Sequence, residues 1–317
     1  MTKRRKSVLP ALTVLVLLLI PLVMIGGVRK FHQLGCDISR PTTGTTALLP
    51  SVGDVVRFAA IGDSGSGNGR QAAVAAAVAR VCRAEGCDFL ALLGDIVYPA
   101  GLDSPDDPDF QRLVLGPYRR LDVPLVPVLG NHDVKGDVAA MLGESRKHSA
   151  WVMPSFQWNF RAGPATFHAI NTNCPVQDLP DLADSLPGAG FAVGRPWQFV
   201  LAHHPIYTVG HHGDADPVTR WYWNHAVRGR VDFYLSGHTH DLEHLRKSGQ
   251  GTDFLISGGG GQPRMEPVEA GPSAADARFR SRGSGFVWFE VRPAGVTFRF
   301  YDTAGKVIYE GTRHRGS

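Results

Sequence analysis

Short apolar runs, each closed by a glycine or a polar cluster, recur along the chain from about residue 54 onward. The first five are Val55 to Ile61, Phe89 to Leu93, Leu125 to Leu129, Phe199 to Ala202 and Val231 to Leu235. Runs of this length without polar alternation are typical of strands that are buried on both faces. We therefore expect five buried strands in this part of the chain.

A helix is predicted between the first two strands. The stretch from Arg70 to Ala84 is rich in alanine, Asn68 is a suitable N-cap, and Gly86 is a suitable stop. The resulting order is strand, helix, strand.

The pattern changes toward the C-terminus. Short apolar segments separated by Gly, Pro or Asp turns predict antiparallel strands at Phe254 to Ile256, Gly285 to Val291, Val296 to Tyr301 and Lys306 to Tyr309. Prolines and glycines interrupt Gln177 to Pro196, so we expect a surface loop there.

The N-terminus differs from the rest of the chain. An uncharged run from Val8 to Val28 follows four cations and precedes Arg29 and Lys30, and about 20 apolar residues suffice to cross a bilayer. We expect a transmembrane anchor in residues 1–30, with a cleaved signal sequence as the alternative, then a linker in 31–53 and a globular domain in 54–317. The charge bias places the domain outside the cytoplasm, in the cell membrane as a single-pass protein, or secreted if the segment is cleaved.

Composition and charge add limited constraints. A chain of 317 residues that is 43 % hydrophobic forms one large domain or two small ones, and a net charge of +4 does not indicate a nucleic-acid surface. The four cysteines are Cys36, Cys82, Cys87 and Cys174. Outside the cytoplasm an even number favours disulfides, and Cys82 and Cys87 are close enough to pair, with buried free thiols as the alternative.

Candidate metal ligands stand at the end of each of the five predicted strands. The motifs are Gly62-Asp63-Ser64-Gly65, Gly94-Asp95-Ile96-Val97-Tyr98, Gly130-Asn131-His132-Asp133, Ala202-His203-His204-Pro205 and Gly237-His238-Thr239-His240. Because the carboxyl ends of strands in an open sheet with crossover connections face one crevice, these groups are expected to converge. A single Gly-Asp is usually a turn and a single His-x-His is often exposed, but five such motifs together indicate a metal site.

In order and spacing, the motifs resemble those of the calcineurin-like metallophosphoesterases over about Phe58 to Gln262. Most of that superfamily carries Asp-x-His in the first motif, whereas here Gly65 cannot coordinate a metal and Tyr98 stands in the second motif. This combination resembles the purple acid phosphatases of the small tartrate-resistant type, and a phenolate suits ferric iron. The resemblance implies an α/β fold, a sandwich of two mixed β-sheets flanked by helices, here with an N-terminal transmembrane helix.

The resemblance also implies a binuclear centre of two metal ions. Fe(III) at the first position would be held by Asp63, Asp95, Tyr98 and His240. Fe(II), Zn or Mn at the second would be held by Asp95, Asn131, His203 and His238, so that Asp95 bridges the two. Such a pair activates water and neutralises phosphate oxygens.

The remaining histidines of the motifs are assigned by the same resemblance. His132 and His212 match the family's catalytic, substrate-side histidines, and His204 is expected to support the ligands. Animal members often carry glutamate where His211 stands, and the segment before the fourth strand lacks their clear amphipathic helix. Core packing is the expected role of four tryptophans, with lining of the cleft as the alternative: Trp158, Trp197, Trp221 and Trp223.

The predicted function is hydrolysis of small phosphate monoesters by an acid phosphatase. The first alternative is a phosphodiesterase on the same site, acting on nucleotides or phospholipids, because substituent pockets lie on variable loops. The second is a non-catalytic metal-binding surface protein, against which His132 and His212 argue, since binding alone does not require them.

Overall fold

The computed structural model describes residues 46–49, 53–173, 175–188, 194–262 and 271–315. Within these ranges no helix has the length and apolar character needed to cross a bilayer. The predicted anchor or signal, Cys36 and Cys174 lie outside the described residues.

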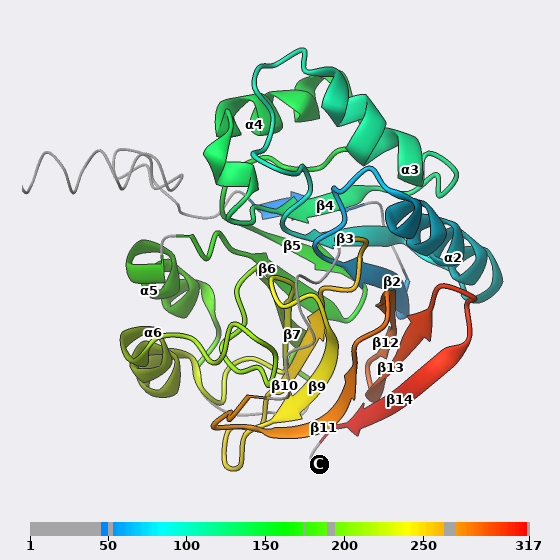
Figure 1. Ribbon diagram of the computed structural model, residues 1–317. Helices are drawn as coiled ribbons and strands as arrows, with labels where there is room; N and C mark the ends of the chain where they lie inside the picture. The colour runs from blue at the N-terminus through cyan, green and yellow to red at the C-terminus, as the bar shows by residue number, and fades with distance from the viewer. Residues whose placement is uncertain (1–45, 50–52, 174, 189–193, 263–270, 316–317) are drawn as a thin grey trace, which may run out of the picture.

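Two mixed β-sheets form the centre of the molecule (Figure 1). The six-stranded sheet has the order β14-β13-β12-β2-β3-β4, in which β2, β3 and β4 are parallel and the other pairings are antiparallel. Its strands are β2 (Val56–Ile61), β3 (Phe89–Leu93), β4 (Leu125–Val128), β12 (Gly285–Arg292), β13 (Gly295–Asp302) and β14 (Val307–His314).

The eight-stranded sheet has the order β1-β5-β6-β7-β8-β10-β9-β11. Strands β6, β7, β8 and β10 run parallel to one another. The strands are β1 (Thr46–Leu48), β5 (Trp158–Ala162), β6 (Ala165–Ala169), β7 (Trp197–Leu201), β8 (Phe233–Ser236), β9 (Leu242–Arg246), β10 (Asp253–Ser257) and β11 (Asp276–Ser281).

Aromatic side chains fill the space between the sheets. Phe58 on β2 stacks on Phe89 and Phe289 at ring-centroid distances of 4.8 and 4.6 Å, and meets Phe167 and Phe199 of the other sheet edge-on at 5.2 and 5.6 Å. These rings are fully buried. Because two inner faces share one core, the sheets pack face to face as a sandwich, which confirms the predicted architecture.

Helices cover both outer faces of the sandwich. On the six-stranded side lie α2 (Gly69–Glu85), η1 (Phe110–Leu115), α3 (Gly116–Tyr118), η2 (Asp133–Lys135) and α4 (Val138–Lys147). On the other side lie α5 (Pro175–Ser185), α6 (Pro217–Tyr222) and η3 (Trp223–Val227). Figure 1 shows α2 beside β2 and α5 with α6 together at the opposite side.

The predicted helix and its neighbouring disulfide are confirmed. The Asn68 side chain accepts the backbone N–H groups of Arg70 and Gln71 and so caps α2. Gly86 follows the helix with φ 88°, a conformation that few other residues adopt. Cys82 and Cys87 are joined by a disulfide across this turn.

Two expectations about the fold are corrected. The segment from Gln177 to Pro196 is not a loop throughout, because α5 occupies its first part, with Leu179 and Leu182 buried against the eight-stranded sheet. Pro180 lies inside this helix, and because proline is disfavoured in helix interiors, the sequence pattern did not indicate a helix. The five motif-bearing strands also do not form one open sheet, since three belong to one sheet and two to the other.

The tryptophans divide between core and surface. Trp158, Trp197 and Trp223 are fully buried, as expected for core residues. Trp221 is 58 % exposed and stacks on the His225 ring at 4.5 Å. Strands β1, β5, β6, β9 and β11 were not predicted.

Candidate metal centre

All five motifs lie where strands end at one side of the sandwich. The two sheets are joined there, because the Gly62 N–H after β2 donates to the Ser257 carbonyl at the end of β10, 2.7 Å away. Asp63, Asp95 and His238 follow their strands with positive φ values of 57°, 52° and 65°. Such backbone conformations are costly for residues with side chains and are concentrated at functional sites.

The first group of predicted ligands surrounds the Tyr98 hydroxyl. This oxygen lies 2.9 Å from Asp95 Oδ2, 3.3 Å from Asp63 Oδ1 and 3.5 Å from His240 Nε2. His240 Nε2 is also 3.4 Å from Asp63 Oδ1. The structure therefore brings together all four residues assigned to the first metal.

Asp95 connects this group to the second one. Its Oδ2 accepts from Tyr98, while its Oδ1 accepts the His132 N–H at 2.8 Å and lies 3.5 Å from His203 Nε2. Burial opposes ionisation, but the charge of His203 and the hydrogen bond from His132 lower the pKa of Asp95 below its ordinary value. Its two oxygens thus face the two groups separately, as a bridging ligand requires.

The second group centres on His203. The Nδ1 atom of His203 lies 2.8 Å from the Leu93 carbonyl, and Nε2 lies 3.0 Å from Asn131 Oδ1. Because a carbonyl oxygen only accepts, Nδ1 is the donor to Leu93, and Nε2 is the ring nitrogen that faces the amide oxygen of Asn131. Hydrogen bonding of the remote nitrogen is how proteins orient imidazole ligands.

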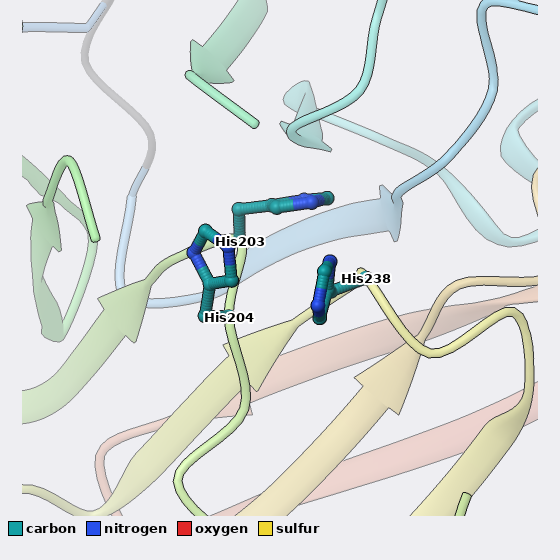
Figure 2. Close-up of side chains that lie close together, drawn as sticks. All are labelled: His203, His204 and His238. Atoms are coloured by element: carbon teal, nitrogen blue, oxygen red, sulfur yellow. The ribbon is translucent and has the colours of Figure 1, made fainter. Parts of the chain in front are cut away.

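Three imidazole rings converge at this point. Figure 2 shows His203 and His204, from the loop after β7, facing His238, from the loop after β8. Their ring centroids are 4.5 to 5.0 Å apart, and one nitrogen of each lies within 4.8 Å of the others. His204 is oriented by Thr172, whose hydroxyl oxygen accepts the His204 N–H at 3.0 Å and lies 2.9 Å from Nδ1.

The electrostatics of the centre suit cations. Asp63 and Asp95 are 0 % and 2 % exposed, and among the described residues their ion-pair partners are histidines only. Burial and both carboxylates raise the pKa of Tyr98 far above its ordinary value, and burial and the neighbouring imidazoles lower the pKa of His238. Buried carboxylates are costly without a strong positive charge nearby, so metal ions fit this donor set of carboxylate, phenol, amide and imidazole groups.

Asp133 is a buried support that the sequence did not identify. One of its oxygens accepts the N–H groups of Ile96 and Val97 at 2.9 and 3.0 Å, and the other accepts that of Gly130 at 2.8 Å. Burial, reinforced by Asp95, raises the pKa of Asp133 to about 7. Through these hydrogen bonds Asp133 ties the loop of Asp95 to the loop of Asn131. Its place in the third motif is the feature of the sequence that could have identified it.

Glycines permit the close approach of these loops. A Cβ atom at Gly94, where φ is +81°, would lie 2.5 Å from His203 Nδ1. A Cβ at Gly130 would lie 2.2 Å from Asp95 Oδ1. Both contacts are too short for any side chain, which explains the glycine before the ligand in these two motifs.

His132 borders the first group. Its Nδ1 lies 2.6 Å from the Pro99 carbonyl and 3.2 Å from Lys135 Nζ, and the shorter contact places the proton on Nδ1. The ring packs beside Tyr98 at 4.5 Å. Nε2 is therefore the ring nitrogen that can contact a bound substrate.

His212 borders the second group. Its ring stacks on His238 at 3.9 Å and contacts His211 at 3.8 Å. The outer side of the ring is exposed, yet partial burial and the imidazoles of His211 and His240 lower its pKa to about 4. Both predicted substrate-side histidines thus adjoin the predicted ligands, one on each side.

A cavity of about 270 Å³ opens beside the three histidines. His204, His212 and His238 form its inner wall, and apolar groups including Leu179, Ile206 and Tyr234 form much of the remainder. The Tyr234 hydroxyl donates to the His204 carbonyl at 2.8 Å, so its polar end is already engaged. The cavity is suited to an apolar substituent next to the metal ligands.

Known proteins that resemble this chain in sequence are phosphoesterases. The sequence profile of the calcineurin-like phosphoesterases matches residues 56–242. Purple acid phosphatase 3 of Arabidopsis thaliana is 31 % identical over 288 residues, which cover 83 % of this chain and 79 % of that protein. Tartrate-resistant acid phosphatase type 5 of Oryctolagus cuniculus is 25 % identical over 308 residues, covering 84 % and 94 %.

Solved structures share the fold. Purple acid phosphatase PPD1 from yellow lupin seeds superposes with a TM-score of 0.65 at 16 % identity, covering 87 % of this chain and 55 % of that one. GAP50, described as the anchor in the inner membrane complex of Plasmodium, has a TM-score of 0.69 at 22 % identity, covering 83 % and 90 %. At these identities the similarity concerns the fold alone.

Proposed function

This chain belongs to the calcineurin-like phosphoesterase family, with purple acid phosphatases as its relatives, and from that membership we propose that it hydrolyses phosphate monoesters at a binuclear metal centre. That the chain is a metal-dependent hydrolase follows from the family. The observation that carries the finer proposal is the position of the Tyr98 hydroxyl, within 3.5 Å of Asp63, Asp95 and His240.

The proposed ligand sets follow the two groups of side chains. Asp63, Asp95, Tyr98 and His240 would hold Fe(III), because phenolate and carboxylate are hard anionic donors. Asp95, Asn131, His203 and His238 would hold Fe(II), Zn or Mn. When bound, such a pair supplies Lewis acidity toward the phosphate oxygens and activates water for attack at phosphorus.

The chain's own groups would act on the leaving group. His132 donates through Nδ1 to Pro99, so Nε2 faces outward for a phosphate or leaving-group oxygen. Nε2 of His132 would donate a hydrogen bond to a phosphate oxygen. His212, which stacks on His238 and lines the cavity, would donate a proton to the departing alkoxide.

The cavity beside the histidines supports a monoester over a diester. It has room for one apolar leaving group next to His204, His212 and His238. A phosphodiesterase must accommodate a second substituent on the same phosphorus. The non-catalytic alternative does not account for His132 and His212, whose rings adjoin Tyr98 and His238.

The deciding experiment compares two esters on the full-length protein. We expect 4-nitrophenyl phosphate to be hydrolysed at least tenfold faster than bis(4-nitrophenyl) phosphate, with two metal ions per chain by elemental analysis. Asp95→Asn should lose both activity and metal, whereas Asp122→Asn, at an exposed residue with φ 53°, serves as the matched control. Faster turnover of the diester would favour the phosphodiesterase, and no turnover with both metals loaded would favour the non-catalytic protein.

The location outside the cytoplasm is a separate part of the proposal. It is supported by the apolar run from Val8 to Val28 with its flanking cations. Full-length protein should sediment with membranes and should be degraded by protease added outside intact cells. Recovery in the cytosolic fraction would contradict it.

A further inference from the structure

Five arginines line a groove between α2 and the η1–α3 segment, on the outer helical face of the six-stranded sheet. The groove has a volume of about 410 Å³, and in the part of the chain that the structure describes no carboxylate lines it. We call it the arginine groove and define it by Arg80, Arg83, Arg112, Arg119 and Arg120. Figure 1 shows α2 and α3 side by side at this edge of the molecule.

The two walls of the groove differ in origin. Arg80 and Arg83 come from the C-terminal half of α2, where the helix dipole stabilises cationic side chains. Arg112, Arg119 and Arg120 come from the segment around η1 and α3. Small alanines of α2 form the floor, so a ligand can approach without meeting bulky side chains.

Most of this positive charge is not neutralised by the protein. Arg112 pairs with Asp109 at 2.7 Å, and Arg80 donates to the Thr303 carbonyl at 2.8 Å. Within the described ranges, the side chains of Arg83, Arg119 and Arg120 are exposed and make no ion pair or hydrogen bond. Three free guanidinium groups around one concave surface repel one another and attract anions.

We propose that the arginine groove binds a condensed phosphate chain, the chemistry shared by inorganic polyphosphate and the triphosphate of a nucleotide. Guanidinium groups bind phosphate oxygens through paired, charge-assisted hydrogen bonds. A condensed phosphate chain is narrow and carries charge on every unit, so it meets the arginines of both walls at once.

Other anionic partners fit the groove less well. A bilayer presents a flat surface, whereas these arginines surround a concavity. Single-stranded nucleic acid is held by aromatic stacking, and no aromatic side chain lines this groove among the described residues. An extended acidic peptide points successive side chains to opposite faces, so only every second carboxylate would meet the arginines.

The inner end of the groove adjoins the first metal-ligand loop. Gly67, four residues after Asp63, lies so close to Arg112 that a Cβ added there would be 2.7 Å from its guanidinium. The Gly67 N–H donates to Gln71, whose side-chain amide donates to the Leu113 carbonyl at 2.7 Å. The proposed site is nevertheless separate from the metal ligands, so its test does not depend on catalysis.

The test is calorimetric titration of the full-length protein, pretreated with chelator, with linear polyphosphate at low salt. Arg83→Gln/Arg119→Gln/Arg120→Gln should weaken binding at least tenfold and reduce its dependence on salt. The matched control removes three exposed arginines elsewhere, Arg146→Gln/Arg161→Gln/Arg228→Gln, and should change affinity less than twofold. Unchanged thermal unfolding of both variants establishes that they are folded.

The outcomes separate the sources and the alternatives. Binding of ATP as tightly as polyphosphate, with adenosine inactive, supports the triphosphate as the ligand, and binding of polyphosphate alone supports the longer chain. Equal loss in both triple variants would overturn the proposal, because it would reflect net charge only. Equal binding of polyglutamate would overturn it in favour of an acidic protein segment.

Discussion

The Nδ1–H of His203 donates to the carbonyl of Leu93, 2.8 Å away, and so links the two β-sheets. His203 follows β7 of the eight-stranded sheet, and Leu93 ends β3 of the six-stranded sheet. Because the bond fixes the orientation of the ring, Nε2 faces Asn131 and Asp95. The packing of the sandwich therefore sets the geometry of the candidate centre.

His203→Ala should lower the metal content from two ions per chain to about one, since it removes a ligand of the second position only. Gly94→Ala should have a similar effect, because its Cβ would lie 2.5 Å from His203 Nδ1. Elemental analysis of purified protein measures both. His225→Ala, at an exposed ring, is the control, and two full equivalents in His203→Ala would contradict the assignment.

Tyr98→Phe should abolish a broad visible absorption band that we expect from a tyrosinate bound to Fe(III). The substitution removes one oxygen and leaves the ring beside His132. Absorption spectra of both proteins, normalised to iron content, measure the effect. A colourless active protein that holds only zinc or manganese would exclude iron at this position.

Asp133→Asn should lower the free energy of unfolding by about 1 to 3 kcal/mol, because the amide has one acceptor oxygen and its NH2 group would face a buried backbone N–H that the carboxyl group now accepts. Urea unfolding measures the change. Asp137→Asn is a useful comparison, since asparagine also caps helices well and α4 should be retained. Equal stability of Asp133→Asn and the parent would show that the loops are held by other contacts.

His168 should make the protein less stable in acid. Burial lowers its pKa from 6.5 to about 4, so the unfolded chain binds a proton that the folded chain does not. Stability from this group is complete above pH 6.5 and falls as the pH drops toward 4, by about 3 kcal/mol in total. Unfolding free energies of the parent and His168→Gln across this range measure it, and parallel curves would contradict the prediction.

Thr219→Trp should reduce kcat/KM for 4-nitrophenyl phosphate at least tenfold while changing that for a small alkyl phosphate less than threefold. Thr219 lines the cavity beside the histidines, so the indole would fill the space that a bulky leaving group occupies. Val218→Trp adds the same ring at the preceding residue, which is 68 % exposed, and should leave kcat/KM for both substrates unchanged. Equal losses for both substrates would show that the cavity does not hold the leaving group.

The sequence by itself determined the strands that carry the ligands. Strands such as β2 and β3 are buried on both faces, so they appear as continuous apolar runs, and the glycine and aspartate that follow mark their ends. The cap of α2 is equally local, because Asn68 contacts residues two and three positions away. Local signals of this kind need no knowledge of the rest of the fold.

Only the tertiary structure decided how these pieces combine. Strand β9 was not recognisable because it buries Glu243 and His244, which are tolerated only through partners such as Thr208 and Asp253. The division into two sheets depends on side chains such as Phe58 and Phe199 that meet across the core. Likewise, Arg83 and Arg119 are 36 positions apart in sequence and share a groove only because α2 and α3 pack together. Contacts between distant segments depend on how whole elements pack, which no local pattern of residues encodes.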